Sequence, residues 1–161
     1  MSLPQVRVDG RAAIVIGPAK AAAARRQAPW IAKLEPWRDL GYEAAALGRF
    51  LGRAATAGQV LVARHDARTQ PLGVLVLQPG VLLGDFVSLL AVRPEAAGRG
   101  IGRALMAHAE AFMDRRWLFV SADATNRAAL RFYGKLGFKR VGRLPDLVRE
   151  GRTEILLRKP R

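Results

Sequence analysis

The stretch DFVSLLAVRPEAAGRGIGRALM, residues 85–106, decides the fold of this 161-residue chain. Its first part, 85–92, is mostly apolar and predicts a buried strand that ends at Arg93-Pro94, because proline cannot continue a hydrogen-bonded ladder. A glycine-rich loop follows, and a helix begins near Ile101. The free backbone N–H groups of such a helix start, together with the helix dipole, attract anions. The stretch therefore predicts a loop that binds phosphate.

The spacing of the glycines in this loop excludes two common nucleotide-binding motifs. A Walker A loop needs Gly-Lys-Ser/Thr, which the chain lacks. A dinucleotide fingerprint needs Gly or Ala three residues after its second glycine, where this chain has Arg103 or Leu105. A different phosphate-bearing ligand is expected. The predicted contacts are the backbone groups of Gly98, Arg99, Gly100, Ile101, Gly102 and Arg103, with positive charge added by the two arginines.

The remaining sequence predicts one domain, 1–161, of α/β (α+β) class with a mixed central sheet. Predicted strands cover 12–16, 58–64, 72–78, 85–92, 117–120, 138–142 and 153–157, and predicted helices cover 19–34, 42–53, 101–115 and 126–136. The strands at 58–64 and 72–78 are separated by a polar turn and predict a hairpin. The predicted order is a hairpin meander followed by alternating strands and helices.

Composition narrows the chemistry. The chain has no Cys and two His, which excludes disulfides and thiol nucleophiles and argues against a metal site. Its formal charge is +14, with 11 basic and 5 acidic residues in 1–80 and 16 and 8 in 81–161. Because this charge is spread over both halves, a nucleic-acid-binding domain is the least favoured function. The N-terminus does not read as a signal peptide and no apolar run is long enough to span a membrane, so a cytoplasmic protein is expected.

Two motifs resemble those of the GNAT acetyltransferase superfamily. LLAVRPEAAGRGIGRALMAHAE, residues 89–110, resembles the acyl-CoA motif, in which the loop reads Arg/Gln-x-x-Gly-x-Gly/Ala. Gly100 and Gly102 match, whereas Ala97 occupies the first position and removes one side-chain contact with pyrophosphate. NRAALRFYGKLGFKRVG, residues 126–142, resembles Asn-x-x-Ala-x-x-x-Tyr-x-x-x-Gly-Phe. The matching residues are Asn126, Ala129, Tyr133, Gly137 and Phe138.

The resemblance implies a fold and a ligand. The fold is a mixed, mostly antiparallel sheet, flanked by about four helices, with a V-shaped split between the fourth and fifth predicted strands. Acetyl-CoA would lie in this split, with its pantetheine along Leu90, Ala91 and Val92 and its pyrophosphate on 98–103. Further implied contacts are Asn126, Ala129, Tyr133 and Lys135.

The implied reaction is direct attack of an amine on the thioester, because a chain without Cys cannot form an acyl-cysteine. Tyr133 matches the family tyrosine that protonates the leaving thiolate, although its helical spacing also fits core packing. The base that removes the amine proton is Glu154, Asp85 or a chain of waters. Glu154 is favoured because a carboxylate within an apolar strand is unusual.

The acceptor is not specified by any motif. It is a small-molecule amine or an amine of a peptide or protein, and Trp30, Trp37, Tyr42 and Phe50 could line its pocket or pack in the core. The alternatives to an N-acetyltransferase are a silent acyl-CoA-binding or regulatory module on the same fold and a basic nucleic-acid-binding domain. An exposed edge strand near the C-terminus makes a homodimer reasonable.

Overall fold

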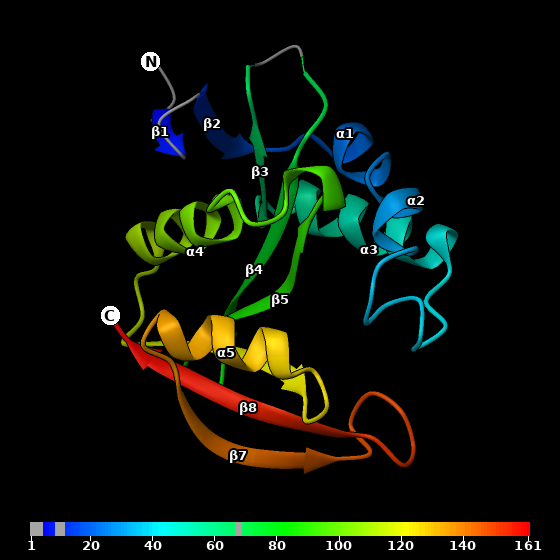
Figure 1. Cartoon of the computed structure of the whole chain (residues 1–161), viewed down its shortest axis with the longest axis vertical. Coiled ribbons are helices and arrows are strands. Elements are labelled where there is room, and N and C mark those ends of the chain that lie inside the picture. Colours follow the sequence, from blue (N-terminus) through cyan, green and yellow to red (C-terminus); the bar gives the residue numbers. More distant parts are fainter. Residues whose placement is uncertain (1–4, 9–11, 67–68) are drawn as a thin grey trace.

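The computed structural model describes residues 5–8, 12–66 and 69–161, and in these ranges a single eight-stranded sheet carries helices on both faces (Figure 1). The sheet order is β1-β2-β3-β4-β5-β6-β8-β7. The strands are β1 (Gln5–Val8), β2 (Ala12–Pro18), β3 (Val60–Arg64), β4 (Gly73–Val81), β5 (Gly84–Val92), β6 (Trp117–Asp123), β7 (Lys139–Pro145) and β8 (Thr153–Pro160). The helices are α1 (Ala21–Arg25), α2 (Ala28–Ile31), α3 (Ala44–Thr56), α4 (Ile101–Phe112) and α5 (Arg127–Lys135), with a 3-10 turn at Pro94–Ala96.

The predicted V-shaped split lies between β5 and β6, the one parallel pair of the described sheet. These strands pair only where Asp85–Val87 face 118–120, and every other neighbouring pair is antiparallel. Beyond Val87, β5 continues beside β4 while β6 continues beside β8. The prediction of a mixed, mostly antiparallel sheet with this split is confirmed. The two strands are fifth and sixth in the chain because β1 was not predicted.

A bulge in β5 lies at the point where the split begins, directly after the last residue that pairs with β6. Val76 of β4 pairs with Leu89 and the next residue, Leu77, pairs with Val87, so Ser88 is the extra residue. The bulge also reverses which face the side chains occupy. Val87 belongs to the core under α4 and α5, whereas Leu89 and Ala91 belong to the core on the opposite face. Leu90 and Val92 consequently pack toward the α4 and α5 side.

Two hydrophobic cores, one on each face, hold the helices. Leu105 of α4 and Leu130 of α5 lie in the first, and Ile31 of α2 and Leu51 of α3 lie in the second. Because β5 contributes to both cores, the strand that begins at the split is fixed from both faces.

Several elements differ from their predictions. The helix predicted over 19–34 is two short helices, because Pro29 fits the first turn of α2 but could not lie inside a continuous helix. α4 ends at Phe112 rather than near 115. The predicted edge strand near the C-terminus is β7, which is mostly exposed, and dimerisation through it stays a prediction. None of the helices in the described ranges has the length and apolarity needed to span a bilayer.

Candidate active site

A cleft of about 380 Å³ opens where β5 and β6 diverge. Its walls come from both arms of the split and from α5, and its rim comes from the segment after α2 and from the β7–β8 loop. The lining residues are Leu34, Glu35, Pro36, Trp37, Leu40, Tyr42, Val87–Val92, Ser121–Asp123, Asn126, Ala129, Tyr133, Val148 and Glu154. The cleft therefore brings together residues that are far apart in the sequence, among them Tyr133 and Glu154.

Tyr133 both packs in the core and lines the cleft. Its ring makes edge-to-face contacts with Phe132 and Phe138, at centroid distances of 5.3 and 5.7 Å. Burial, and to a smaller extent the charge of Glu154, raises the pKa of the Tyr133 phenol to about 12. The phenol is therefore a hydrogen-bond donor at neutral pH.

Glu154 is a buried carboxylate on β8, directly opposite Asp123 of β6. Burial raises the pKa of Glu154, and the charge of Asp123 raises it further, while a hydrogen bond from Ser121 and the charge of Arg152 act in the opposite direction. A carboxylate with a raised pKa is a better proton acceptor than an ordinary one. The predicted base is thus in the cleft, near Tyr133.

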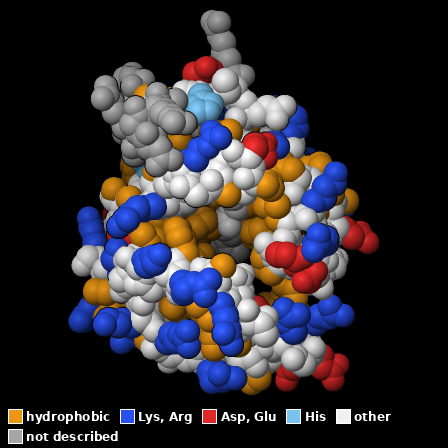
Figure 2. All heavy atoms as spheres, in the orientation of Figure 1, with side chains coloured by type: hydrophobic (Ala, Val, Ile, Leu, Met, Phe, Trp, Pro, Cys, Tyr) orange, Lys and Arg blue, Asp and Glu red, His pale blue; other side chains and the backbone are white. Residues whose placement is uncertain are grey.

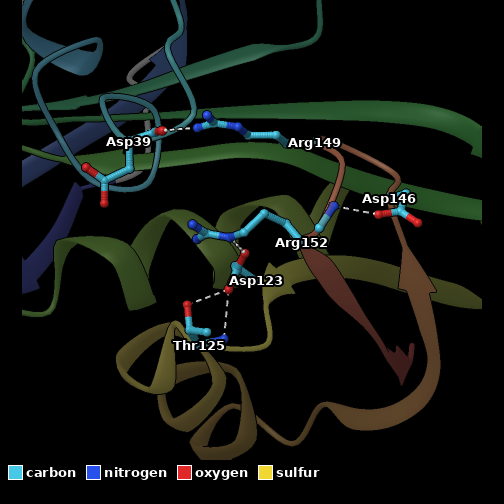
Figure 3. A network of polar contacts seen from close by, with 7 residues as sticks. Asp39, Asp123, Thr125, Asp146, Arg149 and Arg152 are labelled. Atoms are coloured by element: carbon cyan, nitrogen blue, oxygen red, sulfur yellow. Dashed lines mark hydrogen bonds and ion pairs between the residues drawn. The ribbon is translucent and has the colours of Figure 1, made fainter.

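Asp123 belongs to a polar network that the sequence did not reveal (Figure 3). Arg152 donates from Nε to Asp123 Oδ2 at 2.7 Å, and the Thr125 backbone N–H donates to Oδ1 at 2.8 Å. Burial alone would raise the pKa of Asp123, but the hydrogen bonds from Arg152 and Thr125 outweigh it and the pKa is lowered. As the pH falls, Asp123 therefore keeps its charge to a lower pH than its neighbour Glu154 does.

The same network fixes the β7–β8 loop at the rim of the cleft. The Asp146 carboxylate accepts a hydrogen bond from the Gly151 N–H at 2.7 Å within the loop. Arg149 reaches across and donates from Nη1 to the carbonyl oxygen of Asp39 at 2.9 Å (Figure 3). Asp39 lies in the segment between α2 and α3, so this contact joins two rim segments from opposite ends of the chain. Because Arg149 and Asp39 are 110 residues apart in the sequence, local patterns could not have predicted their contact.

The glycine-rich loop has the backbone conformation of an anion cradle. Gly98 and Gly100 have φ values of 74° and 80°, in the left-handed region that favours glycine, and Gly100 is the N-cap of α4. The Ile101 side chain is buried in the core, so only its backbone is available to a ligand. A methyl group at Gly102 would lie 3.3 Å from Cζ of Phe132, so this glycine also lets α4 and α5 approach each other. Arg99 and Arg103 are exposed beside the loop.

Other predicted residues have clear structural places. Asn126 caps α5 by accepting a hydrogen bond from the Ala129 N–H at 3.0 Å, and both residues line the cleft. Lys135 is exposed at the end of α5 and does not line it. Asp85, the alternative base, forms an ion pair with Arg115 at 3.0 Å and lines a separate hollow beside His108.

The four N-terminal aromatic residues differ in whether they reach the cleft. Trp37 and Tyr42 line it, and Trp37 also packs against the core between the sheet and α1–α3. Trp30 and Phe50 pack against the same core. Within the described part of the chain, no group of three or more His, Asp or Glu side chains could hold a metal ion.

Comparison with known proteins agrees with this geometry. A family model described as an acetyltransferase (GNAT) domain matches residues 56–140. The peptidyl-lysine N-acetyltransferase YjaB of Escherichia coli (strain K12) is 34% identical over 78 residues, which are 48% of each chain. This chain therefore matches about half the length of that curated relative.

Two solved structures resemble the fold. An acetyltransferase of the GNAT family from Bacillus cereus superposes with a TM-score of 0.75 at 16% identity, covering 92% of this chain and 97% of the other. Arabidopsis thaliana NAA60 in complex with a bisubstrate analogue superposes with a TM-score of 0.72 at 18% identity, covering 91% and 97%. With the split sheet, the glycine-rich loop and a family match over more than half of its length, this chain belongs to the GNAT acetyltransferase family.

Proposed function

We propose that this protein transfers an acetyl group from acetyl-CoA to a primary amine in the cytoplasm, by direct attack within a ternary complex. The observation that carries the proposal is the position of Tyr133 and Glu154 in one cleft, at the point where β5 and β6 separate. One can donate a proton and the other can accept one, and the reaction needs both.

The proposed path of acetyl-CoA follows β5. Its pyrophosphate would sit on the backbone of 98–103, and its pantetheine would run along Leu90–Val92. Two features support this path. Leu90–Val92 lie beyond the last residue of β5 that pairs with β6, and they line the cleft. The positive φ values of Gly98 and Gly100 support the cradle at the other end.

The proposed chemistry balances two proton transfers. The amine nitrogen attacks the thioester carbonyl carbon, the C–N bond forms and the C–S bond breaks. Glu154 takes the proton lost by the amine, directly or through water, and Tyr133 stabilises the leaving thiolate. A thiol has an ordinary pKa of about 8.5, so a thiolate cannot fully deprotonate a phenol whose pKa is about 12. Tyr133 therefore first stabilises the thiolate through a hydrogen bond to sulfur. When Tyr133, as general acid, passes its proton to sulfur, the phenol is restored by the proton that Glu154 took from the amine, which returns through solvent.

The proposed acceptor enters on the side of the segment between α2 and α3. Trp37, Leu40 and Val148 give this part of the cleft an apolar surface, while Glu154 adds a carboxylate that attracts an ammonium group. Glu35 also lines the cleft, but it forms an ion pair with Arg38. The buried Ser88 hydroxyl, which has no hydrogen-bond partner among the described residues, offers a further polar contact. These features suit an amine on a partly apolar carrier, a small molecule or a peptide. The name of the E. coli relative favours a peptide lysine.

The deciding experiment is a thiol-release assay with acetyl-CoA against polyamines, amino acids, lysine-containing peptides and peptides with free N-termini. We expect turnover with at least one of these classes. Calorimetry of acetyl-CoA binding accompanies it. Binding without turnover for every amine would identify a silent acyl-CoA-binding module, and absence of both would overturn the proposal.

A further inference from the structure

A second hollow, of about 410 Å³, lies between α5 and β7 and is walled by arginines. Arg127 and Arg131 come from α5, and Arg140 and Arg143 come from β7. Its apolar lining residues are Ala124, Leu130 and Ile155, and no Asp or Glu belongs to the lining. We call this hollow the arginine pocket. Figure 2 shows Lys and Arg side chains gathered on the lower part of this face, over α5 and β7.

No carboxylate of the described residues forms an ion pair with the four arginines of the pocket. Elsewhere, Arg152 pairs with Asp123, Arg115 with Asp85 and Arg93 with Glu95. Four like charges around one hollow repel one another, so this arrangement favours an anion between them.

The local sequence concentrates charge more than the two halves of the chain suggest. Residues 124–145 contain six Lys or Arg and no Asp or Glu, which is +6 of the total +14. The even division between halves predicted a dispersed charge. The fold instead brings the arginines of a helix and of a strand to opposite walls of one hollow, which composition alone could not indicate.

The arginine pocket faces away from the proposed acetyl-CoA loop. Arg127 and Arg131 are four residues apart and share one face of α5. Phe132, the α5 residue that approaches Gly102 of α4, lies about 120° around the same helix from the middle of that face, at about 100° per residue. Tyr133 faces the cleft instead, and none of the four arginines lines it. The pocket is thus separate from the site described above.

We propose that the arginine pocket binds a ligand with several phosphates in a row, supplied by a nucleic-acid backbone or by a free polyphosphate. A single phosphate would leave most of the four positive charges uncompensated. The tetrahedral oxygens of a phosphate point in more directions than the two coplanar oxygens of a carboxylate, so successive phosphates suit guanidinium groups on facing walls better than carboxylates do. Because the other lining residues, Ala124, Leu130 and Ile155, are apolar, the guanidinium groups are the polar side-chain groups that a bound ligand would contact.

The test compares two double variants of equal charge. Arg140→Gln/Arg143→Gln removes one wall of the pocket, and Arg49→Gln/Arg53→Gln removes two exposed arginines of α3 on the other face of the sheet. Binding of a fluorescent single-stranded RNA is measured by anisotropy at several salt concentrations. Tripolyphosphate and poly-glutamate of equal charge serve as competitors.

We expect the pocket variant to bind about tenfold more weakly and the α3 variant to change less than about threefold. For single strands each phosphate contact contributes about 0.7 to the salt slope, so the slope should fall by about 1.4 in the pocket variant. Displacement by tripolyphosphate in preference to poly-glutamate supports the proposal. Tripolyphosphate binding without RNA binding, measured by calorimetry, would assign the free polyphosphate as the source.

Three results would overturn the proposal: equal weakening by both double variants, equal competition by poly-glutamate, or no binding of either phosphate probe. The acetyl-CoA affinity of the pocket variant should remain unchanged. A weaker acetyl-CoA affinity would mean that the pocket belongs to acetyl-CoA. If the β7 variant melts early, Arg127→Gln/Arg131→Gln removes the opposite wall and repeats the test.

Discussion

Asp123 and Glu154 lie directly opposite each other on β6 and β8, and Arg152 forms its ion pair with Asp123. Two neighbouring carboxylates thereby acquire different proton affinities. The pKa of Asp123 is lowered by its hydrogen bonds, while burial and the charge of Asp123 raise the pKa of Glu154. A carboxylate that stays ionised raises the pKa of a carboxylate beside it, and this is a common way to make the second group a better base.

Glu154→Gln should lower turnover about tenfold or more at neutral pH, because the amide cannot accept the amine proton. In the native protein, the proposed activity should show a kcat/KM that falls as the pH decreases through the raised pKa of Glu154, above its ordinary 4.5, because protonation removes the base. Thiol-release rates across pH measure both effects. Asp85→Asn is the control, since that carboxylate lines a different hollow, and an unchanged rate is expected. Full activity of Glu154→Gln would remove this residue from the mechanism.

Tyr133→Phe should lower turnover about tenfold or more, equivalent to about 1.4 kcal/mol, and leave acetyl-CoA affinity nearly unchanged. The ring keeps its edge-to-face contacts with Phe132 and Phe138, so only the hydroxyl is lost. Steady-state kinetics and calorimetry separate the two quantities. Unchanged turnover would leave Tyr133 with a packing role alone.

Asp123→Asn should destabilise the protein by about 1–3 kcal/mol, because it removes the charged acceptor of the Arg152 and Thr125 hydrogen bonds. The lowered pKa of Asp123 adds stability above the ordinary value of 3.8, and this stability disappears as the pH falls through the lower pKa of the folded state. Urea unfolding should therefore show a large difference between native and variant at pH 7 and a smaller one near pH 3. A difference that does not change with pH would contradict this role for the charge.

Arg99→Ala/Arg103→Ala should weaken acetyl-CoA binding about tenfold, because two exposed cations beside the cradle are lost. The backbone of the loop, with its two left-handed glycines, is unaltered by these substitutions. Acetyl-pantetheine, which has no pyrophosphate, provides the matched ligand, and its affinity should not change. Equal weakening for both ligands would mean that the variant disturbs the split rather than the cradle.

Sequence reasoning succeeded where the information is local. The loop at 98–103 lies in one contiguous motif, and Asn126, Ala129 and Tyr133, the N-cap and two residues of α5, lie in another. The local structure of both motifs follows from spacing and capping. It failed where partners are distant. Asp123 and Arg152 are 29 residues apart and meet only because β6 and β8 are neighbours. The two walls of the arginine pocket likewise depend on the packing of α5 beside β7.

Local prediction also erred where a segment is very short. β1 is QVRV, and an alternation of polar and apolar residues over only four positions is too short to distinguish a strand from a loop without its pairing with β2. The sequence contains Pro29, which indicates the start of a new helix, but the alanine-rich residues around it favoured one continuous helix. The structure instead ends α1 at Arg25 and begins α2 at Ala28.

The short pairing between β5 and β6 divides the sheet into two blocks of strands. Three residue pairs join a five-stranded block to a three-stranded one, and elsewhere along this line the strands have parted. Such a narrow seam is where thermal loosening should begin, because few cross-strand hydrogen bonds must break to open it. A ligand bound in the split would contact both blocks and hold them together. Occupancy of the split would slow amide exchange in β5 and β6 together, so that the folded lifetime of the protein follows the supply of its ligand.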